Sequence, residues 1–350
     1  MAEKLICVIG VTGNQGGSVA RRFLKDPHFR VRGLTRDNAS DASQKLVGEG
    51  VEMVIADLDD VESLKVAFKG ANVIFSVTNY WEPFFRPDYR AKAEELGITC
   101  RKYAYDVEYR QGKNIADAAA TVVDTLDVNG FLVSTLSHAA KCSNGTYKEL
   151  YHYDAKADIF PGYVREKYPS LAAKASWIQT GYFNTSHRLL PGSYFVKVCQ
   201  DPFTPPPHSL HHQSNSTNVQ FVQLADDSIQ MQLPTVPSKP QPHLAVAEDM
   251  GNFTYAVYQM PPGNNYMAAG TFCSWSDWIT TWGKVSGSTI SYNQVDPETM
   301  ITASGDRQFG IEVTDMFCYS SDPGYDGGME LLTAEDLRKV SYLLGAIGEV

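Results

Sequence analysis

The fold is decided by residues 10–19, GVTGNQGGSV, which join a short apolar run to a helical pattern. Residues 5–9 predict a buried strand, and residues 18–24 predict an amphipathic helix. Three glycines, Gly10, Gly13 and Gly16, stand in the turn between them. A glycine-rich turn lets the backbone approach a bound anion, and the start of the helix adds oriented N–H groups. The stretch therefore predicts a site for the pyrophosphate of a dinucleotide.

The glycine spacing is GxxGxxG, whereas the commonest dinucleotide-binding fingerprint is GxGxxG. A tight structural turn is the alternative explanation for three such glycines. The next predicted strand, FRVRGLTRD (29–37), favours the cofactor because it ends in Arg36. A guanidinium group pairs with a 2′-phosphate through two hydrogen bonds, so NADP is favoured over NAD. A solvent-facing loop arginine is the alternative, and Asp37 follows directly.

Two further predicted strands end in polar residues at the same edge of the sheet. VEMVIAD (51–57) ends in Asp57, which we expect to border adenine, and ANVIFSVTNYW (71–81) ends in Thr78 and Asn79 on the nicotinamide side. Strand and helix patterns alternate to about residue 180, which predicts an α/β fold, a Rossmann-type doubly wound parallel sheet. We expect an NADP-binding domain over residues 1–185 and a smaller C-terminal α/β substrate region over residues 186–350.

Later elements are predicted from the same periodicities. Helical patterns cover residues 107–126, 152–168, 243–260 and 274–287, and strand patterns cover residues 130–137, 176–184 and 265–272. Thr333 and Asp336 have the spacing of a capping box at the start of a last helix.

Residues 201–242 are dense in Pro, Ser, Asn and His, which predicts a long surface loop around one short strand pair. This loop holds His208, His211 and His212. Neither an acid nor a cysteine stands at ligand spacing from these histidines, so a polar loop is favoured over a metal site.

The composition excludes several classes of protein. A net charge of −10 argues against non-specific binding of nucleic acid. No apolar run approaches the roughly 20 residues that a membrane span needs, and the start of the sequence lacks a signal-peptide pattern. The six cysteines include no CxxC pair, and Cys7 is expected in the core of the first strand. We expect a cytoplasmic protein.

Five stretches resemble, in order, landmarks of the NmrA-like family, whose members are atypical short-chain dehydrogenases. They are GVTGNQGGSVARRFL, VRGLTRD, VIFSVTNYWE, QGKNIADAA and HYDAKADI. The similarity covers residues 3 to about 190, and VTNYWE with QGGSVAR points to the branch that includes the eukaryotic NADPH-sensor proteins. The resemblance implies NADP(H) between a Rossmann domain and a small C-terminal substrate domain.

The resemblance also implies the residues that bind the cofactor. Those around the pyrophosphate would be Gly10, Thr12, Gly13, Asn14, Gln15 and Gly16. Arg36 would hold the 2′-phosphate, and Asp57 and Leu58 would flank adenine. The path toward nicotinamide would be lined by Thr78, Asn79, Tyr80, Lys156, Tyr182 and Phe183. Relatives often place the asparagine of this last turn one residue later than Asn184.

Ordinary short-chain dehydrogenases use Tyr-x-x-x-Lys, in which the lysine lowers the pKa of the tyrosine so that the phenol acts as an acid. Tyr109 and Lys113 have this spacing, but they lie on the helix before the fifth strand, which makes the match accidental. After that strand, Tyr153 stands three residues before Lys156, so the usual dyad is absent.

Related reductases of the isoflavone-reductase type manage with a lysine of the equivalent helix. The resemblance thus implies that Lys156 is an acid–base group or a clamp on the nicotinamide ribose, and a solvated helix lysine is the alternative. The catalytic candidates are Lys156, Tyr153 and Asp106.

A segment rich in aromatic and charged residues covers residues 83–110, PFFRPDYRAKAEELGITCRKYAYDVEYR, and looks longer than its counterpart in the sensor proteins. It leaves the edge of the sheet where open α/β proteins bind ligands. Aromatic faces hold flat apolar groups or cations, and Asp88 or Asp106 can pair with an amine. The alternative is a packed surface lid. The substrate candidates are Trp81, Phe85, Asp88, Tyr89, Tyr103 and Tyr105.

Three functions remain open. The first is an NADPH-dependent reductase of a C=O, C=N or C=C bond in an aromatic or alkaloid secondary metabolite. The second is a non-redox cyclase of the iminium or Pictet–Spengler type, in which carboxylates such as Asp88, Asp106 and Asp154 act and NADP(H) only shapes the pocket. The third is a regulator that binds NADP(H) and a protein partner. The absent dyad counts against the first and the aromatic segment against the third. We favour the reductase, as a monomer or a homodimer.

Overall fold

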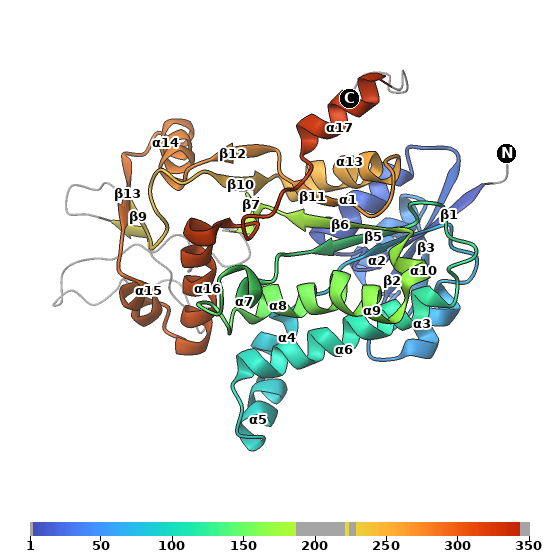
Figure 1. The fold of residues 1–350 in the computed structure, drawn as a ribbon, viewed down its shortest axis with the longest axis horizontal. Coiled ribbons are helices and arrows are strands. Elements are labelled where there is room, and N and C mark those ends of the chain that lie inside the picture. The colour runs from blue at the N-terminus through green and yellow to red at the C-terminus, as the bar shows by residue number, and fades with distance from the viewer. Residues whose placement is uncertain (1–2, 187–220, 224–228, 344–350) are drawn as a thin grey trace. The chain divides into compact units, whose positions relative to one another are not determined.

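A seven-stranded sheet forms the centre of the computed structural model, which describes residues 3–186, 221–223 and 229–343 (Figure 1). The strand order is β11-β6-β5-β4-β1-β2-β3, and every neighbouring pair is parallel. The strands are β1 Lys4–Val8, β2 Phe29–Thr35, β3 Glu52–Ile55, β4 Val73–Ser76, β5 Phe131–Thr135, β6 Ala175–Thr180 and β11 Asn265–Ala268. The predicted doubly wound α/β fold is confirmed.

Strand β1 shows why the sheet is buried on both faces. Its side chains point alternately to the two faces, as period two requires. Leu5 and Cys7 join one apolar core, and Ile6 and Val8 join the other. Cys7 is fully buried, as predicted, and burial raises the pKa of its thiol to about 12.

Helices cover each face of the sheet (Figure 1). The core that contains Leu5 also takes side chains of α3 (Val61–Ala67) and α6 (Cys100–Ala120). The opposite core takes side chains of α1 (Asn14–Phe23), α2 (Asp41–Gly48) and α13 (Val246–Tyr258). Helix α17 (Ala334–Leu343) begins with the predicted cap, because Asp336 accepts hydrogen bonds from the backbone N–H and the hydroxyl of Thr333 at 2.9 Å.

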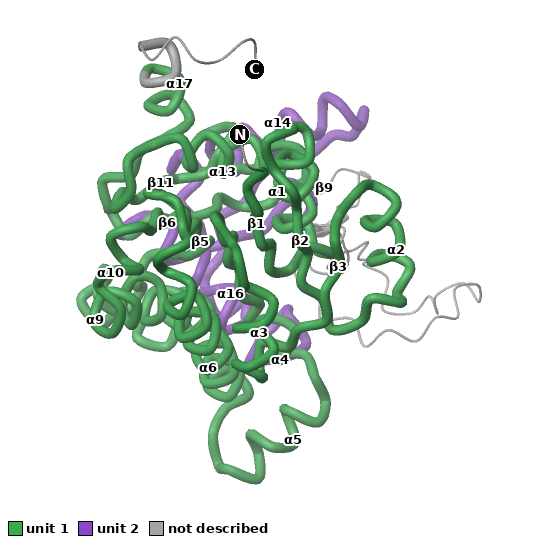
Figure 2. Tube along the Cα trace, turned by 90° about the vertical axis from the view of Figure 1, so that its right-hand side faces the viewer, with its two compact units in different colours: residues 1–183, 242–271, 326–350 green, residues 184–241, 272–325 purple. Residues whose placement is uncertain are grey.

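The described residues divide into two compact units (Figure 2). The first unit contains residues 1–183, 242–271 and 326–350, and so the whole seven-stranded sheet. The second unit contains residues 184–241 and 272–325. The chain leaves the first unit and returns to it twice. The units are therefore not two consecutive stretches of sequence, as residues 1–185 and 186–350 would be. The roles expected for residues 1–185 and 186–350 stay predictions.

The second unit has a small sheet in the order β13-β9-β8, with β8 Phe221–Gln223, β9 Ile229–Leu233 and β13 Ile290–Gln294. Strands β8 and β9 are the short antiparallel pair expected near the proline-rich loop. The helices of the second unit are α14 Trp275–Ser286, α15 Pro297–Ala303 and α16 Arg307–Tyr319, and a kinked stretch, Ser320–Gly324, follows α16.

Several predicted elements are split. The helix expected over residues 152–168 is divided into α8 (Tyr151–Ala157), a kinked stretch at residues 158–163 and α9 (Val164–Lys167). The kink lies at Phe160, whose backbone is not helical, because Pro161 lacks the N–H that a continuous helix needs. Short α10 (Pro169–Ala172) follows. The strands expected over residues 176–184 and 265–272 each divide between two sheets. Their second halves are β7 (Tyr182–Phe183) and β12 (Thr271–Cys273), which form the sheet β12-β10-β7 with β10 (Gln241–Leu244).

The aromatic segment, together with the two residues before it, is helical and follows β4 after a short loop. It forms α4 (Trp81–Phe85), α5 (Pro87–Glu95) and the first half of α6, which begins at Cys100 and not at residue 107 as expected. In Figure 1, α5 lies at the end of α6 that is farther from β2 and β3. Among the described residues, no helix has both the length and the apolar character required to cross a membrane.

Candidate functional site at the carboxyl edge of the sheet

The glycine turn after β1 brings the backbone close to itself. Gly10 has φ +64°, in the region that favours glycine. A Cβ on Gly16 would lie 2.3 Å from the carbonyl oxygen of Gly10, so helix α1 can pack on the turn only without a side chain there. The exposed residues of the turn are Gly10, Thr12, Gly13 and Asn14.

The N-terminus of α1 can receive an anion. Gly13 is the N-cap, and among the described residues no side chain caps this helix. The first turn also carries no acidic residue, so the positive end of the helix dipole is not neutralised locally. Oε1 of Gln15 is buried and has no hydrogen-bond partner among the described residues. Buried polar atoms are normally paired, so a bound ligand could supply the missing donor. The turn therefore fits the pyrophosphate and ribose of a dinucleotide.

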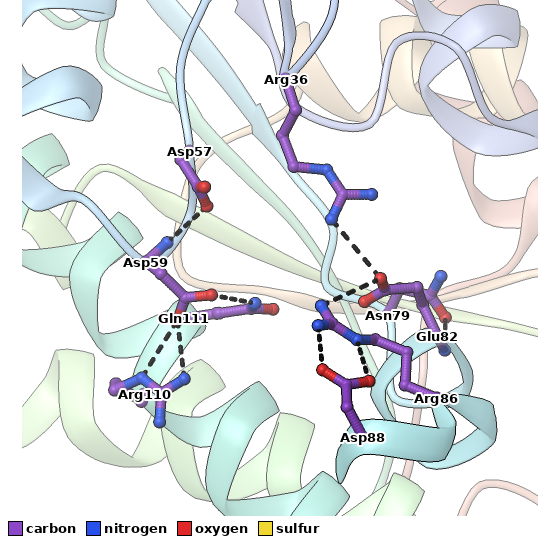
Figure 3. Close-up of polar contacts among 9 residues, drawn as sticks. All are labelled: Arg36, Asp57, Asp59, Asn79, Glu82, Arg86, Asp88, Arg110 and Gln111. Atoms are coloured by element: carbon purple, nitrogen blue, oxygen red, sulfur yellow. Dashed lines mark hydrogen bonds and ion pairs between the residues drawn. The ribbon is translucent and has the colours of Figure 1, made fainter.

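The carboxyl ends of β2, β3 and β4 lie at the same edge of the sheet, with β1 between β4 and β2. Figure 3 shows the polar residues that follow these strands. The side chain of Arg36, after β2, is 66% exposed, and its Nη1 lies 3.4 Å from Oε1 of Glu82. Asp57, after β3, accepts a hydrogen bond from the backbone N–H of Asp59 at 2.9 Å. Asn79, after β4, accepts one from the backbone N–H of Trp81 at 3.1 Å and so fixes the start of α4.

Helix α6 holds the loop that follows β3. Arg110 forms an ion pair with Asp59 at 2.8 Å, and Gln111 donates a hydrogen bond to the same carboxylate at 3.1 Å (Figure 3). Asn114 donates a hydrogen bond to the carbonyl oxygen of Leu58 at 2.8 Å. The loop expected to flank adenine is thus positioned by the helix that continues the aromatic segment.

A buried ion pair lies farther along the edge. Glu108 of α6 is completely buried, and its Oε1 contacts Nζ of Lys156 in α8. The hydroxyl of Thr78, after β4, donates a hydrogen bond to the same oxygen at 2.6 Å. The side chain of Lys156 is 12% exposed, so this lysine is not a solvated surface residue. The structure therefore joins two predicted site residues, Thr78 and Lys156, through a carboxylate.

Sequence reasoning missed Glu108. Its signal was an acidic residue on the apolar stripe of a helix, since Ala104, Glu108, Gln111 and Ile115 follow the spacing of one helical face. A carboxylate in that stripe must find a partner when the helix packs. The partner is Lys156, whose distance of 48 residues along the chain hides the pairing from the sequence.

His138, just beyond β5, joins a second polar cluster that the sequence did not indicate. Its Nδ1 lies 3.0 Å from Asp154 and its Nε2 lies 3.1 Å from Asp158. Burial by itself would lower the pKa of this histidine, but the two carboxylates raise it to about 9. Tyr105 of α6 donates a hydrogen bond to the other oxygen of Asp158 at 2.7 Å.

The aromatic candidates form separate groups. Trp81 and Phe85 of α4 stack with ring centroids 6.0 Å apart, and Trp81 lies 5.1 Å from the ring of His152 in α8. Tyr89 and Tyr103 form an edge-to-face pair at 5.4 Å. Tyr105 instead donates a hydrogen bond to Asp158 and so joins the cluster around His138.

The remaining candidates are placed as follows. Asp106 pairs with Lys102 on the partly exposed side of α6, and Asp88 pairs with Arg86. Tyr153 is fully buried in α8. Lys113 pairs with Asp117, as expected if its spacing from Tyr109 is accidental.

Tyr80 is also fully buried, and its hydroxyl donates a hydrogen bond to the backbone carbonyl of Arg101 at 3.2 Å. Tyr182 and Phe183 form β7, and Tyr182 is buried. The three loop histidines lie outside the described residues, and no group of His, Cys, Asp or Glu within the described residues could hold a metal ion.

Residues 2–199, more than half of the sequence, match the NmrA-like family. The chain belongs to the NmrA-like family. This confirms the family inferred from the sequence motifs. Members of the family named as oxidoreductases are among its relatives, and NmrA itself is among its structural neighbours.

Two relatives illustrate the range of similarity. The NmrA-like family domain-containing oxidoreductase hkm9 of Aspergillus hancockii is 39% identical over 142 residues, which are 41% of this chain and 36% of hkm9. The match therefore spans about a third of that relative's length. The NmrA-like family domain-containing oxidoreductase ptmS of Penicillium ochrochloron is 27% identical over 328 residues, which are 91% of this chain and 84% of ptmS.

The fold is similar to that of NmrA, a negative transcriptional regulator solved in complex with NADP. The TM-score is 0.64 at 17% identity, and the match covers 100% of this chain and 93% of NmrA. NmrA has also been solved in complex with NAD. At this identity the likeness concerns the NmrA-like fold.

Proposed function

We propose that the protein is an NADP(H)-dependent oxidoreductase that reduces a C=O, C=N or C=C bond of a small aromatic molecule. The observation that carries the proposal is the buried pair of Lys156 and Glu108 beside Thr78, at the same sheet edge as the glycine turn. The relatives named as oxidoreductases and the neighbour solved with NADP support it.

The cofactor would be held by residues of the first unit. The turn around Gly10, Gly13 and Gly16 would receive the pyrophosphate, Arg36 the 2′-phosphate, and the loop at Asp57 and Leu58 the adenine. When bound, NADPH supplies a hydride.

Lys156 is suited to the proton that accompanies that hydride. Its ammonium group has three donors, and one contacts Glu108, so the others can be directed at a ligand. A hydride acceptor gains negative charge on its oxygen, nitrogen or carbon, and an adjacent ammonium stabilises that charge and donates a proton. Glu108 holds the lysine in place and balances its charge, since both side chains are largely buried.

The carboxylates that a cyclase would use are already engaged in ion pairs. Asp88 pairs with Arg86, Asp106 with Lys102, and Asp154 with His138. Lys156 is also paired, so the preference for reduction over acid-catalysed cyclisation rests on the relatives named as oxidoreductases.

The test measures NADPH absorbance and product together during turnover of a panel of aromatic ketones, imines and enones by the full chain. The proposal expects one NADPH consumed per product. It also expects a loss of turnover in Lys156→Met under conditions where circular dichroism shows this variant folded and it still binds NADPH. Lys113→Met is the control, because it also removes a lysine from an ion pair, here with Asp117, which is separate from the Glu108–Lys156 pair.

Product formed equally well with NADP⁺, and without consumption of NADPH, would replace reduction by non-redox catalysis. No turnover of any substrate, combined with NADP(H)-dependent binding of a protein, would instead establish a regulator.

A further inference from the structure

A second arginine lies beside the expected 2′-phosphate position. Arg86 stands between α4 and α5, in the aromatic segment, where the sequence motifs give it no role. Its Nη1 lies 3.9 Å from Oε1 of Glu82, the same oxygen that Nη1 of Arg36 approaches to 3.4 Å. In Figure 3 the guanidinium groups of Arg36 and Arg86 reach this one carboxylate from different elements.

The direction of Arg86 is set by its other contacts. Its Nε and Nη2 bind the two oxygens of Asp88 at 3.0 and 2.5 Å, and the guanidinium lies over the ring of Tyr89 at 3.8 Å. Asp88 thus takes the Nε–Nη2 edge of the guanidinium and Tyr89 takes one of its faces. The remaining nitrogen, Nη1, is directed at Glu82. A group held in this way loses little side-chain entropy when it binds an anion.

Glu82 is held where an anion is needed. The side chain of Asn79 accepts a hydrogen bond from the backbone N–H of Glu82 at 3.4 Å, at the start of α4. The carboxylate of Glu82 is partly exposed and lies between the guanidinium groups of Arg36 and Arg86. The same arrangement suits a phosphate, which has several acceptor oxygens.

We propose that Arg86 and Arg36 together bind the 2′-phosphate of NADP(H), and that Glu82 occupies this position until the phosphate displaces it. The inference rests on the proposed cofactor and adds a determinant of its specificity. A 2′-hydroxyl carries no charge, so it gains nothing from the second arginine and cannot displace Glu82 by charge. The aromatic segment would thus contribute to cofactor selection.

The experiment measures binding of adenosine 2′,5′-bisphosphate and of adenosine 5′-monophosphate to the full chain by calorimetry, without turnover. Arg36→Ala should weaken the bisphosphate at least about tenfold, and Arg86→Ala about three- to tenfold, as expected for charge-assisted contacts at a partly exposed site. Glu82→Gln should strengthen it about two- to fivefold, because the competing charge is gone. Adenosine 5′-monophosphate should bind the native chain and all three variants with equal affinity.

Lys92→Ala is the matched control, since it removes one positive charge of α5 whose ion-pair partner is Glu95 and not Glu82. It should leave both affinities unchanged, and far-ultraviolet circular dichroism should show every variant folded.

The outcomes separate the inference from the function on which it rests. If the bisphosphate binds better than the monophosphate, and Arg36→Ala weakens the bisphosphate while Arg86→Ala leaves its affinity unchanged, the role of Arg86 is overturned while the NADP assignment stands. If Arg86→Ala and Lys92→Ala weaken binding of the bisphosphate equally, the effect comes from net charge alone, and the role of Arg86 is overturned as well. If the native chain binds neither the bisphosphate nor NADPH, both proposals fail.

Discussion

Replacing the buried partners Glu108 and Lys156 tests whether they are one energetic unit. Glu108→Leu removes the carboxylate, which leaves the Lys156 ammonium, 12% exposed, without this counter-charge and the Thr78 hydroxyl without this acceptor. Lys156→Met leaves a completely buried carboxylate with only the hydroxyl. Removing one partner of a buried ion pair costs about 3–5 kcal/mol. Each single variant should therefore lose a large part of a stability that is typically about 5–15 kcal/mol.

The double variant Glu108→Leu/Lys156→Met should be much more stable than the sum of the single changes predicts. Both charges are then gone, and an apolar pair of similar volume in place of a buried ion pair is often neutral or even stabilising. The coupling free energy should be about 3 kcal/mol or more. The exposed pair Lys102 and Asp106, on the same helix, should give a coupling below about 1 kcal/mol.

The assay is urea unfolding of the full chain, followed by circular dichroism, for the four members of each cycle. Hydrogen exchange of the α6 and α8 amides shows whether the loss is local to the two helices. Additive effects of Glu108→Leu and Lys156→Met would refute the reasoning, because independent residues do not rescue one another.

Three other perturbations have defined outcomes. Gly16→Ala should abolish NADPH binding measured by fluorescence, because the new Cβ would meet backbone at 2.3 Å, whereas Gly48→Ala, with no atom within 4 Å of its Cβ, should bind normally. The pKa of His138 is raised in the folded protein, from an ordinary 6.5 to about 9, so its stabilising contribution is complete below about 6.5 and falls as pH rises to about 9. His138→Gln should remove that part of the pH dependence in urea unfolding, and an unchanged profile would contradict it. Trp81→Ala should raise the KM for an aromatic substrate while the Kd for NADPH stays the same; a parallel rise in both would place this ring at the cofactor instead.

The features that depend on neighbouring residues could be predicted from the sequence. The strand, turn and helix around Gly10 and Gly16 are local, since the steric demand for glycine arises within one turn of chain. The positions of Arg36, Asp57 and Thr78 at one edge followed as well, because parallel strands all present their carboxyl ends on the same side. The continuous helix expected over residues 152–168 was wrong at Pro161, and the strands at residues 176–184 and 265–272 were wrong where each divides between two sheets.

What the sequence determined by itself was therefore the family, the parallel sheet and the edge at which a ligand would bind. Only the tertiary structure decided which charged groups meet at that edge. Glu108 meets Lys156 across 48 residues of sequence. Arg36 reaches Glu82 across 46 residues, at the oxygen that Arg86 approaches from four residues away. The packing of α4 and α6 against the sheet fixes these meetings. That packing is set by the burial of apolar surface between distant segments. The periodicity of a segment shows which of its faces is apolar, but it does not show which other segment covers that face.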